Sequence, residues 1–378
     1  MNKVLLGDVA VEHKETCKGS KDGYPIVGLE HLIPEEITLT AWDEGSENTF
    51  SKMFRKGNVL FGRRRAYLKK AAVAPFDGIC SGDITVIEAK PDRILPELLP
   101  FIIQNDDLFD FAVGKSAGSL SPRVKWEHLK NYEFKLPDME KQKELAELLW
   151  AMDNTKKSYQ KLIAATDELV KSQFMELFGD PVTNTQGREV RPFKDFMLDI
   201  RYGTSQPPTF NELGEFKFIR ATNIKAGRIT ENGMLRISAD EAAKIEKCRL
   251  NGNEIIIVRS GANTGDTCVV TDEYRDQYAG YDIIVTLNLE IANPVFFNEL
   301  MNTHYMQAII KPLTVRAAQP HINSEQVQNL PMLVVPLQEQ EQFATFVRQS
   351  DKSKFAALSC SNLNLSLCSE NPRTAQTQ

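Results

Sequence analysis

Apolar and polar positions follow two different patterns along the chain. From residue 136 to 178, apolar residues recur every three or four positions, which is the spacing of one face of an α-helix. Before residue 136, and again between residues 180 and 335, short apolar runs alternate with Gly, Asn, Asp and Pro, as in β-strands joined by turns. The pattern predicts two strand-rich segments separated by one long helix.

The long helix has clear end signals. Pro137 cannot continue a preceding helix, Asp138 is an N-cap candidate, and Gly179 with Pro181 ends the helix. About forty residues at ~1.5 Å each make a rod of roughly 60 Å, longer than one domain is wide. One register predicts a coiled-coil seam for a second helix or a partner: Leu145, Leu148, Met152, Tyr159, Leu162 and Leu169. Taken alone, a helix of this kind is more often a long core helix of a single domain.

The same signals return near the end of the chain. The stretch VPLQEQEQFATFVRQSD at 335–351 echoes LPDMEKQKELAELLWAMD at 136–153, and Pro336 lies 199 positions after Pro137. An acidic first turn follows again, with an apolar stripe that we expect to pack: Phe343, Phe346 and Val347. The repeat makes a single-domain core helix the weaker interpretation.

The strand-rich segments repeat as well. Residues 54–73 align loosely with 250–270, residues 80–90 with 278–290, and Asp83 and Asp282 are again 199 positions apart. We therefore predict a tandem duplication. The predicted fold class is α+β, with two strand-rich domains alternating with two long helices that pack antiparallel as a coiled coil. The expected segments are a first domain at 1–136, a helical region at 137–179, a second domain at 180–335 and a C-terminal helical region and tail at 336–378.

The second helix departs from the first after Asp351. The sequence KSKFAALSCSNLNLSLCSENPRTAQTQ is rich in Ser and Asn and loses its apolar stripe after Leu358. This pattern predicts a short or interrupted helix, and such a helix would weaken the pairing of the two helices.

Composition narrows the class of protein. A hydrophobic share of 42% and a charged share of 25% are ordinary for a folded globular protein. No apolar run approaches the roughly 18 residues of a membrane span and the N-terminus lacks a signal-peptide pattern, so we expect no membrane contact and a cytoplasmic location. The six cysteines form no CxxC pair and have no His at ligand spacing, which favours reduced thiols over a metal site or a disulfide framework.

Two similar domains on antiparallel helices would be related by an approximate two-fold axis, which duplex DNA also has. Helices that overlap over ~20 to 30 residues would hold the two domains about one DNA turn, ~34 Å, apart. The net charge of -6 requires any nucleic-acid surface to be local. The helices would then set the distance between two DNA-reading domains.

Each domain contains a candidate DNA-reading loop between two strands. In the first domain the loop is basic and holds an aromatic residue: Arg63, Arg64, Arg65, Tyr67, Lys69 and Lys70. The matching loop of the second domain carries less charge: Arg259, Ser260, Asn263 and Thr264. Such side chains can contact phosphates and base edges. A charged strand edge that discourages aggregation would look similar.

A second candidate surface precedes each long helix. Residues 114–129 and 314–327 combine small residues, a proline and cations, as a loop lying on a phosphate backbone would. The cations are Lys115 and Arg123 in the first domain, and Arg316 and His321 in the second. Turn chemistry explains these loops almost as well.

Enzymatic signals are weak. NPVF at 293–296 differs by one residue from the NPPY or NPPF motif of adenine methyltransferases, but Asn293 and Pro294 more plausibly start a helix. Asp83, Glu88 and Lys90 mimic a nuclease centre, yet the second copy keeps only Asp282, so strand initiation is the preferred interpretation. No P-loop is present. An interaction protein that binds another protein or a glycan remains a third class.

The combination of these features resembles a known family, the specificity (S) subunit of type I restriction-modification systems. The resemblance covers nearly the whole chain and rests on the repeated helix starts, LFGDPVTN at 177–184 and VLFGRRRAYLKKAAVAPFDGICSGDITVI at 59–87. It implies a chain without catalysis that reads a gapped, two-part target in double-stranded DNA, one half with each domain.

The resemblance also implies partners. Two methyltransferase (M) subunits would bind along the helices and methylate adenine flipped out of the duplex, and restriction (R) subunits would complete the complex. S-adenosylmethionine, ATP and magnesium are expected on these partners and no cofactor on this chain. A related system with a fused methyltransferase-nuclease, or a silent truncated allele, stays open as an alternative.

Overall fold

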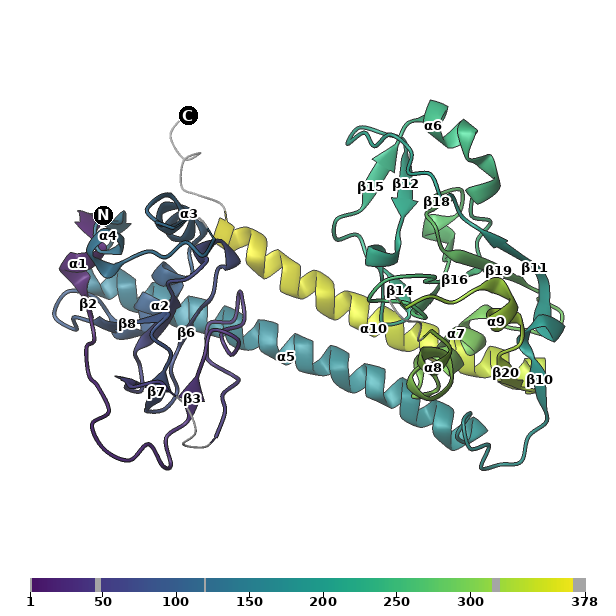
Figure 1. Ribbon diagram of the computed structural model, residues 1–378, viewed down its shortest axis with the longest axis horizontal. Helices are drawn as coiled ribbons and strands as arrows, with labels where there is room; N and C mark the ends of the chain where they lie inside the picture. Colours follow the sequence, from purple (N-terminus) through teal and green to yellow (C-terminus); the bar gives the residue numbers. More distant parts are fainter. Residues whose placement is uncertain (1, 45–48, 119, 315–319, 370–378) are drawn as a thin grey trace. The chain divides into compact units, whose positions relative to one another are not determined.

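The computed structural model describes residues 2–44, 49–118, 120–314 and 320–369, except for the side chains of residues 307 and 355–369. The chain divides into two compact units, Met1–Ser158 and Tyr159–Gln378, and the division falls within the long helix α5 (Met139–Phe178). Each unit contains small sheets, short helices and part of α5 (Figure 1). The predicted α+β class with two strand-rich domains is confirmed.

The first unit is built on a four-stranded antiparallel sheet in the order β2-β8-β5-β6 and a three-stranded sheet in the order β3-β7-β4. Its strands are β1 (Asn2–Leu5), β2 (Ala10–Glu12), β3 (Ile26–Val27), β4 (Lys52–Phe54), β5 (Val59–Gly62), β6 (Ala71–Val73), β7 (Gly78–Cys80), β8 (Ile84–Ala89) and β9 (Glu133–Leu136). Its helices are α1 (Leu6–Val9), α2 (Leu99–Ile103), α3 (Asp106–Gly114), α4 (Trp126–Leu129) and the start of α5. Central strands β5 and β8 are largely buried, so they anchor the loops that follow and precede them.

The second unit repeats this plan with the sheets β11-β19-β16-β17 and β15-β12-β18. Its strands are β10 (Val190–Pro192), β11 (Met197–Tyr202), β12 (Phe216–Ile219), β13 (Ile224–Lys225), β14 (Arg228–Ile229), β15 (Leu235–Ile237), β16 (Ile255–Ile257), β17 (Thr267–Val269), β18 (Tyr278–Ala279), β19 (Ile283–Leu287) and β20 (Pro331–Leu333). Its helices are α6 (Ala239–Lys244), α7 (Pro294–Asn302), α8 (Lys311–Thr314), α9 (Ser324–Gln328) and α10 (Leu337–Ser369), with a π-helical turn at Met306–Ile310.

The repeated topology agrees with the predicted duplication. In both units the strand before the candidate loop, β5 or β16, pairs antiparallel with β8 or β19. Strands β3 and β12 each run parallel to a short partner, β7 or β18. Asp83 and Asp282 directly precede β8 and β19, so the predicted strand starts are confirmed.

A buried glutamine in the first turns of each long helix fastens the helix to its domain. Gln142 accepts a hydrogen bond from the Leu95 amide at 2.8 Å and donates one to the Pro137 carbonyl at 2.9 Å. Gln340 accepts from the Asn293 amide at 2.8 Å and donates to the carbonyls of Val335 (2.7 Å) and Ile291 (3.1 Å). We call Gln142 and Gln340 the latch glutamines. The duplication thus includes the attachment of each helix.

Within the second unit, α5 and α10 pack antiparallel, as predicted. Phe343 near the start of α10 contacts Phe174 and Phe178 near the end of α5, with ring centroids 5.5 and 5.4 Å apart. Further along α10, Lys354 pairs with Asp167, which lies earlier on α5. The two helices therefore run in opposite directions. Phe343 and Val347 are buried in this contact and Phe346 packs against it, in agreement with the sequence.

The seam predicted on α5 is not the face that this chain buries, and its packing against a partner stays a prediction. Leu145, Leu148, Leu162 and Leu169 are 37%, 57%, 52% and 51% exposed, and Met152 and Tyr159 are partly buried. The buried residues form a neighbouring stripe: Gln142, Ala146, Asp153, Val170, Phe174 and Phe178. Apolar spacing alone pointed to the leucines because two positions of the true inner stripe are polar.

The predicted interruption of the second helix is also wrong. Helix α10 runs through Leu358 to Ser369 and has 33 residues, against 40 in α5. Ser and Asn each cost only a few tenths of a kcal/mol in a helix relative to better formers, and no Gly or Pro occurs from Asp351 to Ser369. The predicted tail at 370–378 lies outside the described residues. In the part of the chain that the structure describes, no helix is long and apolar enough to cross a membrane.

Candidate nucleic-acid interface

In the first domain, the two candidate loops form one surface. Backbone hydrogen bonds join the Arg65 amide to the Pro122 carbonyl (2.8 Å) and the Val124 amide to the Arg63 carbonyl (3.0 Å). Arg64 and Arg123 face each other in a β-bridge. Residues 63–70 and the segment around Arg123 are therefore parts of a single site, although the sequence pattern predicted two separate surfaces.

Asp83 organises the charges of this surface. Its carboxylate accepts hydrogen bonds from Arg123 Nε at 2.7 Å and Nη2 at 3.2 Å, and it lies 3.6 Å from Arg64 Nη1. Arg64 Nε also donates to Ser121 Oγ at 2.7 Å. The hydrogen bond from Arg123 holds the pKa of Asp83 below its usual value despite partial burial. Arg64 and Arg123 are thus oriented by an acid, and part of their charge is neutralised.

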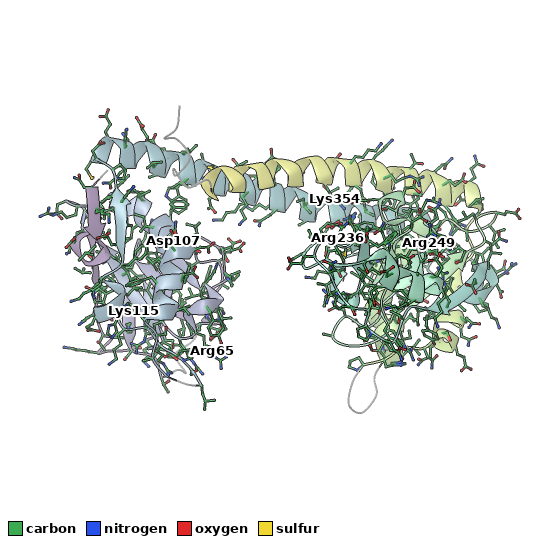
Figure 2. All side chains as sticks on the ribbon, turned by 90° about the horizontal axis from the view of Figure 1, so that it is seen from above. Arg65, Asp107, Lys115, Arg236, Arg249 and Lys354 are labelled. Carbon is green, nitrogen blue, oxygen red and sulfur yellow. The ribbon has the colours of Figure 1, made fainter. Side chains whose placement is uncertain are left out.

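Arg65 and Tyr67 are the most exposed predicted residues of this loop. Arg65 has a left-handed backbone with φ 53° before a short 3₁₀ turn, and Tyr67 is 55% exposed. Lys115 is exposed with its ammonium 5.7 Å from the centre of the Phe111 ring. Figure 2 shows Arg65 and Lys115 on the part of the first domain away from α5. These side chains are exposed to solvent, and their contact with DNA stays a prediction.

Two other predicted cations of this loop, Lys69 and Lys70, have local partners, and a third, Arg63, is partly buried. Lys69 donates to Asp106 at 2.6 Å, and that hydrogen bond raises the pKa of its ammonium. Lys70 donates to the Leu29 carbonyl at 2.7 Å. Arg63 is partly buried, and its Nε has no hydrogen-bond partner among the described residues. These residues shape the loop more than they extend its surface.

The second domain brings its two loops together in the same way. Ser260 and His321 form the equivalent β-bridge, and the Ile322 amide donates to the Arg259 carbonyl at 2.9 Å. Asp282 accepts a hydrogen bond from the Arg259 amide at 3.1 Å. Burial raises the pKa of Asp282 to about 6, opposite in direction to that of Asp83. Arg316 lies outside the described residues.

Arg259 is enclosed by aromatic rings. Its guanidinium carbon lies 4.4 Å from the centre of the Tyr202 ring and 4.3 Å from that of Tyr281, and its Nε donates to His321 Nε2 at 2.8 Å. The sequence analysis missed both tyrosines because they belong to β11 and to the turn before β19. The one available signal was the position of Tyr281 next to the duplicated Asp282.

Two other predicted residues of this loop serve its conformation. Thr264 is buried, and its hydroxyl donates to the carbonyls of Gly261 (2.6 Å) and Pro320 (3.2 Å), which contradicts a direct contact of this side chain with DNA. Asn263 donates to the Ala221 carbonyl at 3.2 Å. A small polar residue in a loop is as often part of its turn as of its surface.

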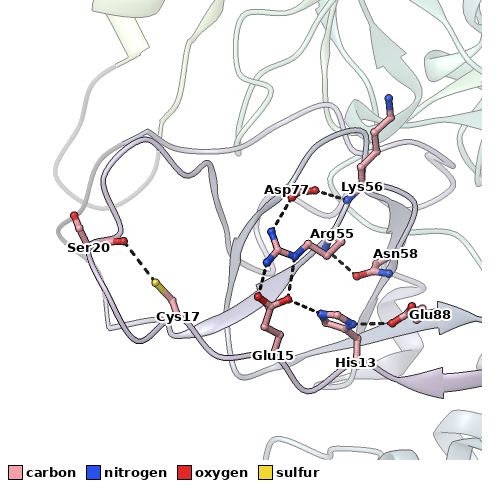
Figure 3. A network of polar contacts seen from close by, with 9 residues as sticks. All are labelled: His13, Glu15, Cys17, Ser20, Arg55, Lys56, Asn58, Asp77 and Glu88. Atoms are coloured by element: carbon pink, nitrogen blue, oxygen red, sulfur yellow. Dashed lines mark hydrogen bonds and ion pairs between the residues drawn. The ribbon is translucent and has the colours of Figure 1, made fainter.

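The enzyme-like patterns are used structurally. Glu88 pairs with His13 at 2.7 Å, in a network that continues through Glu15 to Arg55 and Asp77 (Figure 3). Lys90 donates to the Gly7 carbonyl at 2.7 Å, so it does not share a centre with Asp83 and Glu88.

The methyltransferase-like NPVF stretch starts a helix. Asn293 caps α7 through the amides of Val295 (3.0 Å) and Phe296 (3.4 Å). No group of three or more His, Cys, Asp or Glu is arranged to hold a metal ion within the described ranges.

The four cysteines with described side chains are free thiols: Cys17, Cys80, Cys248 and Cys268. Cys80 in β7 and Cys268 in β17 are fully buried. Burial raises the pKa of the Cys80 thiol to about 12 and raises that of Cys268 as well. Neither thiol is reactive in the folded domain.

The chain matches a model of a known protein family. The family described as the type I restriction modification DNA specificity domain matches residues 3–165 and 189–359. The two matched ranges contain both loop surfaces and most of both long helices. The chain belongs to this family.

Individual members of the type I specificity family are distant relatives of the chain. This chain is 26% identical over 179 residues to the type I restriction enzyme EcoDI specificity subunit of Escherichia coli. The matched stretch covers 46% of this chain and 36% of that protein. The match thus spans little more than a third of that curated relative.

Solved structures share the fold. The type I S subunit from M. genitalium has a TM-score of 0.60 at 11% identity, covering 97% of this chain and 93% of its own. A chain from a structure on the complex assembly and conformational transition of the type I R-M system has a TM-score of 0.50 at 19% identity, with 97% and 95% covered.

Proposed function

We propose that this chain is the non-catalytic specificity subunit of a type I restriction-modification complex and that it reads a gapped, two-part target in double-stranded DNA. One observation carries the proposal. In each domain of this family member, two loops that are far apart in sequence join into one surface above a duplicated aspartate. Two equivalent surfaces with different side chains suit two different half-sites.

The exposed leucines of α5 support the proposed partners. Leu148, Leu162 and Leu169 are fourteen and seven residues apart, so they share one heptad position, and they are about half exposed, which is unusual for large apolar side chains on one helix. An apolar helix of a methyltransferase subunit would bury them. In this proposal two M subunits bind along the helices, R subunits complete the restricting complex, and the complex acts in the cytoplasm.

The chemistry belongs to the partners in this proposal. S-adenosylmethionine on the M subunits would supply the methyl group for adenine, and ATP and magnesium would serve the R subunits. The residues of this chain bind and position the DNA. A recognition subunit for a fused methyltransferase-nuclease would use the same surfaces. The silent-allele alternative loses much of its basis because α10 is continuous to Ser369.

Adenine methylation mapped across the genome tests the proposal. We expect one gapped, two-part motif to be methylated when the gene is expressed with its neighbouring methyltransferase gene, and to be unmethylated when this gene alone is deleted. A genome whose methylation is unchanged by the deletion would contradict the proposal. Re-expression of the intact gene is the control, since it should restore the same motif.

A further inference from the structure

Arg259 is held differently from Arg201 and Arg249 in the same domain. Arg249 pairs with Glu246 and Asp276, and Arg201 pairs with Glu254. Arg259 has no carboxylate partner among the described residues. Its contacts are instead two tyrosine rings and one histidine nitrogen. Its charge is therefore not neutralised locally.

Three side chains restrict the orientation of the Arg259 guanidinium. The centres of the Tyr202 and Tyr281 rings lie at nearly equal distances from its carbon, and its Nε donates to His321 Nε2 at 2.8 Å. The backbone is held too, because Asp282 accepts from its amide. The side chain loses little conformational entropy when it binds a ligand.

The two terminal nitrogens remain available. Arg259 is partly exposed, Tyr281 is 42% exposed, and no described residue accepts a hydrogen bond from Nη1 or Nη2. Two parallel N–H donors in a fixed plane match two acceptors in one plane. In the DNA major groove that pair is O6 and N7 of guanine, whereas adenine offers one donor and one acceptor. A phosphate can accept the same two donors, but it has no N7 atom, so replacement of guanine by 7-deazaguanine distinguishes the two contacts.

Resting on the proposed function, we propose that Arg259 reads one guanine of the DNA target through O6 and N7. The first domain does not repeat this arrangement. There Arg64 and Arg123 are held by Asp83, and among the described residues no tyrosine ring lies against the Arg63 guanidinium. The guanine contact is therefore specific to the half-site that the second domain reads, and Tyr202 and Tyr281 are positioning residues for it.

The test uses the assembled complex with its methyltransferase and the target duplex found by methylation mapping. Each guanine is replaced in turn by 7-deazaguanine, which lacks the N7 acceptor, and the affinity of the wild-type complex is measured. We expect one guanine at which the replacement weakens binding on the order of tenfold. In Arg259→Lys the effect of the same replacement should be smaller, because a single ammonium replaces the guanidinium fork while the charge stays.

Arg249→Lys in the same domain is the matched control and should keep the full sensitivity, because Arg249 is committed to Glu246 and Asp276. Tyr281→Ala is a second variant that leaves the guanidinium but removes one ring, and we expect a reduced sensitivity at the same guanine. Equal sensitivity at every guanine in wild type and both Arg259 and Tyr281 variants would overturn the assignment, as would a target with no sensitive guanine. A wild-type complex that prefers no gapped target at all would instead overturn the proposed function.

Discussion

Asp83 and Asp282 occupy equivalent positions and behave in opposite ways. The guanidinium of Arg123 lowers the pKa of Asp83, whereas the residue at the matching position in the second domain is His321, which bonds Arg259 instead. Asp282 is left with a backbone donor and burial, and its pKa rises to about 6. The residues that face the shared aspartate therefore decide whether a carboxylate neutralises a nearby arginine, as in the first domain, or does not, as for Arg259.

This contrast predicts opposite pH effects of removing each charge. Because the pKa of Asp83 is lowered, its stabilising effect is present above the unfolded pKa near 3.8 and is lost as pH falls through the folded value. Asp83→Asn should then lower the free energy of unfolding at pH 7 by roughly 1–2 kcal/mol. The difference from wild type should shrink at strongly acidic pH.

Asp282 should give the reverse result. Its folded pKa of about 6 lies above the unfolded value, so wild-type stability is lost relative to a neutral side chain as pH rises from about 4 through 6. Asp282→Asn should be more stable than wild type at pH 7, by on the order of 2 kcal/mol, and equal to it below pH 4. Urea unfolding at several pH values measures both. Two variants with the same pH profile would contradict this account.

At the scale of elements, the latch glutamines predict how firmly a domain is held on its helix. Gln340→Leu would leave the Asn293 amide and the carbonyls of Val335 and Ile291 without their partner inside the protein. We expect a loss of roughly 2–4 kcal/mol in the free energy of unfolding, because each buried unpaired group costs about 1–3 kcal/mol.

Gln338→Leu is the matched control for the latch, since Gln338 lies two residues earlier on the same helix and is exposed. Its effect on thermal or urea unfolding should stay within about 0.5 kcal/mol. If both substitutions destabilise equally, the buried hydrogen bonds of Gln340 are not the cause.

The sequence predicted most elements but not the faces they bury. The 199-residue spacing of Pro137 and Pro336 was sufficient for the duplication and both helices, because repeated punctuation survives where side chains diverge. The inner face of α5 was missed because its Gln142 and Asp153 are polar yet buried. Burial of a polar side chain depends on partners that only the folded domain supplies, here the Leu95 amide for Gln142.

The candidate site was predictable to a similar depth. The reading loops were identified by their position between strands and by their cations, but their pairing was not, because Arg64 and Arg123 are 59 residues apart and meet only in the fold. The contact of Tyr202 with Arg259 could not be predicted either, because it also forms only in the fold. Thr264 was assigned to DNA contact although its hydroxyl closes a turn.

At the scale of the whole molecule, the continuous helix between the two domains predicts a change in the DNA target when its length changes. An insertion of seven helical residues between Ser158 and Tyr159 adds about 10 Å, or roughly three base pairs, while nearly preserving the helix face. We expect methylation mapping to show an altered gap, or no modification if α10 can no longer pair. An unchanged gap in an active complex would contradict a spacing role for α5.

Alanine substitutions over 155–161 without any change in length are the control for the insertion. They should leave the gap unaltered, since in the proposed function the loops and not this stretch read the half-sites. An altered gap in the control would mean that helix sequence, not helix length, sets the distance.

The buried thiols of Cys80 and Cys268 allow the opening of each domain to be measured separately. A thiol shielded in β7 can be alkylated only when the first domain opens, and one in β17 only when the second does. Rates of labelling at the two sites, resolved by mass spectrometry of peptides, would follow the opening of each domain separately in the intact chain. Target DNA should slow alkylation at both cysteines if both domains bind it. It should slow alkylation at only one cysteine if a single domain binds its half-site.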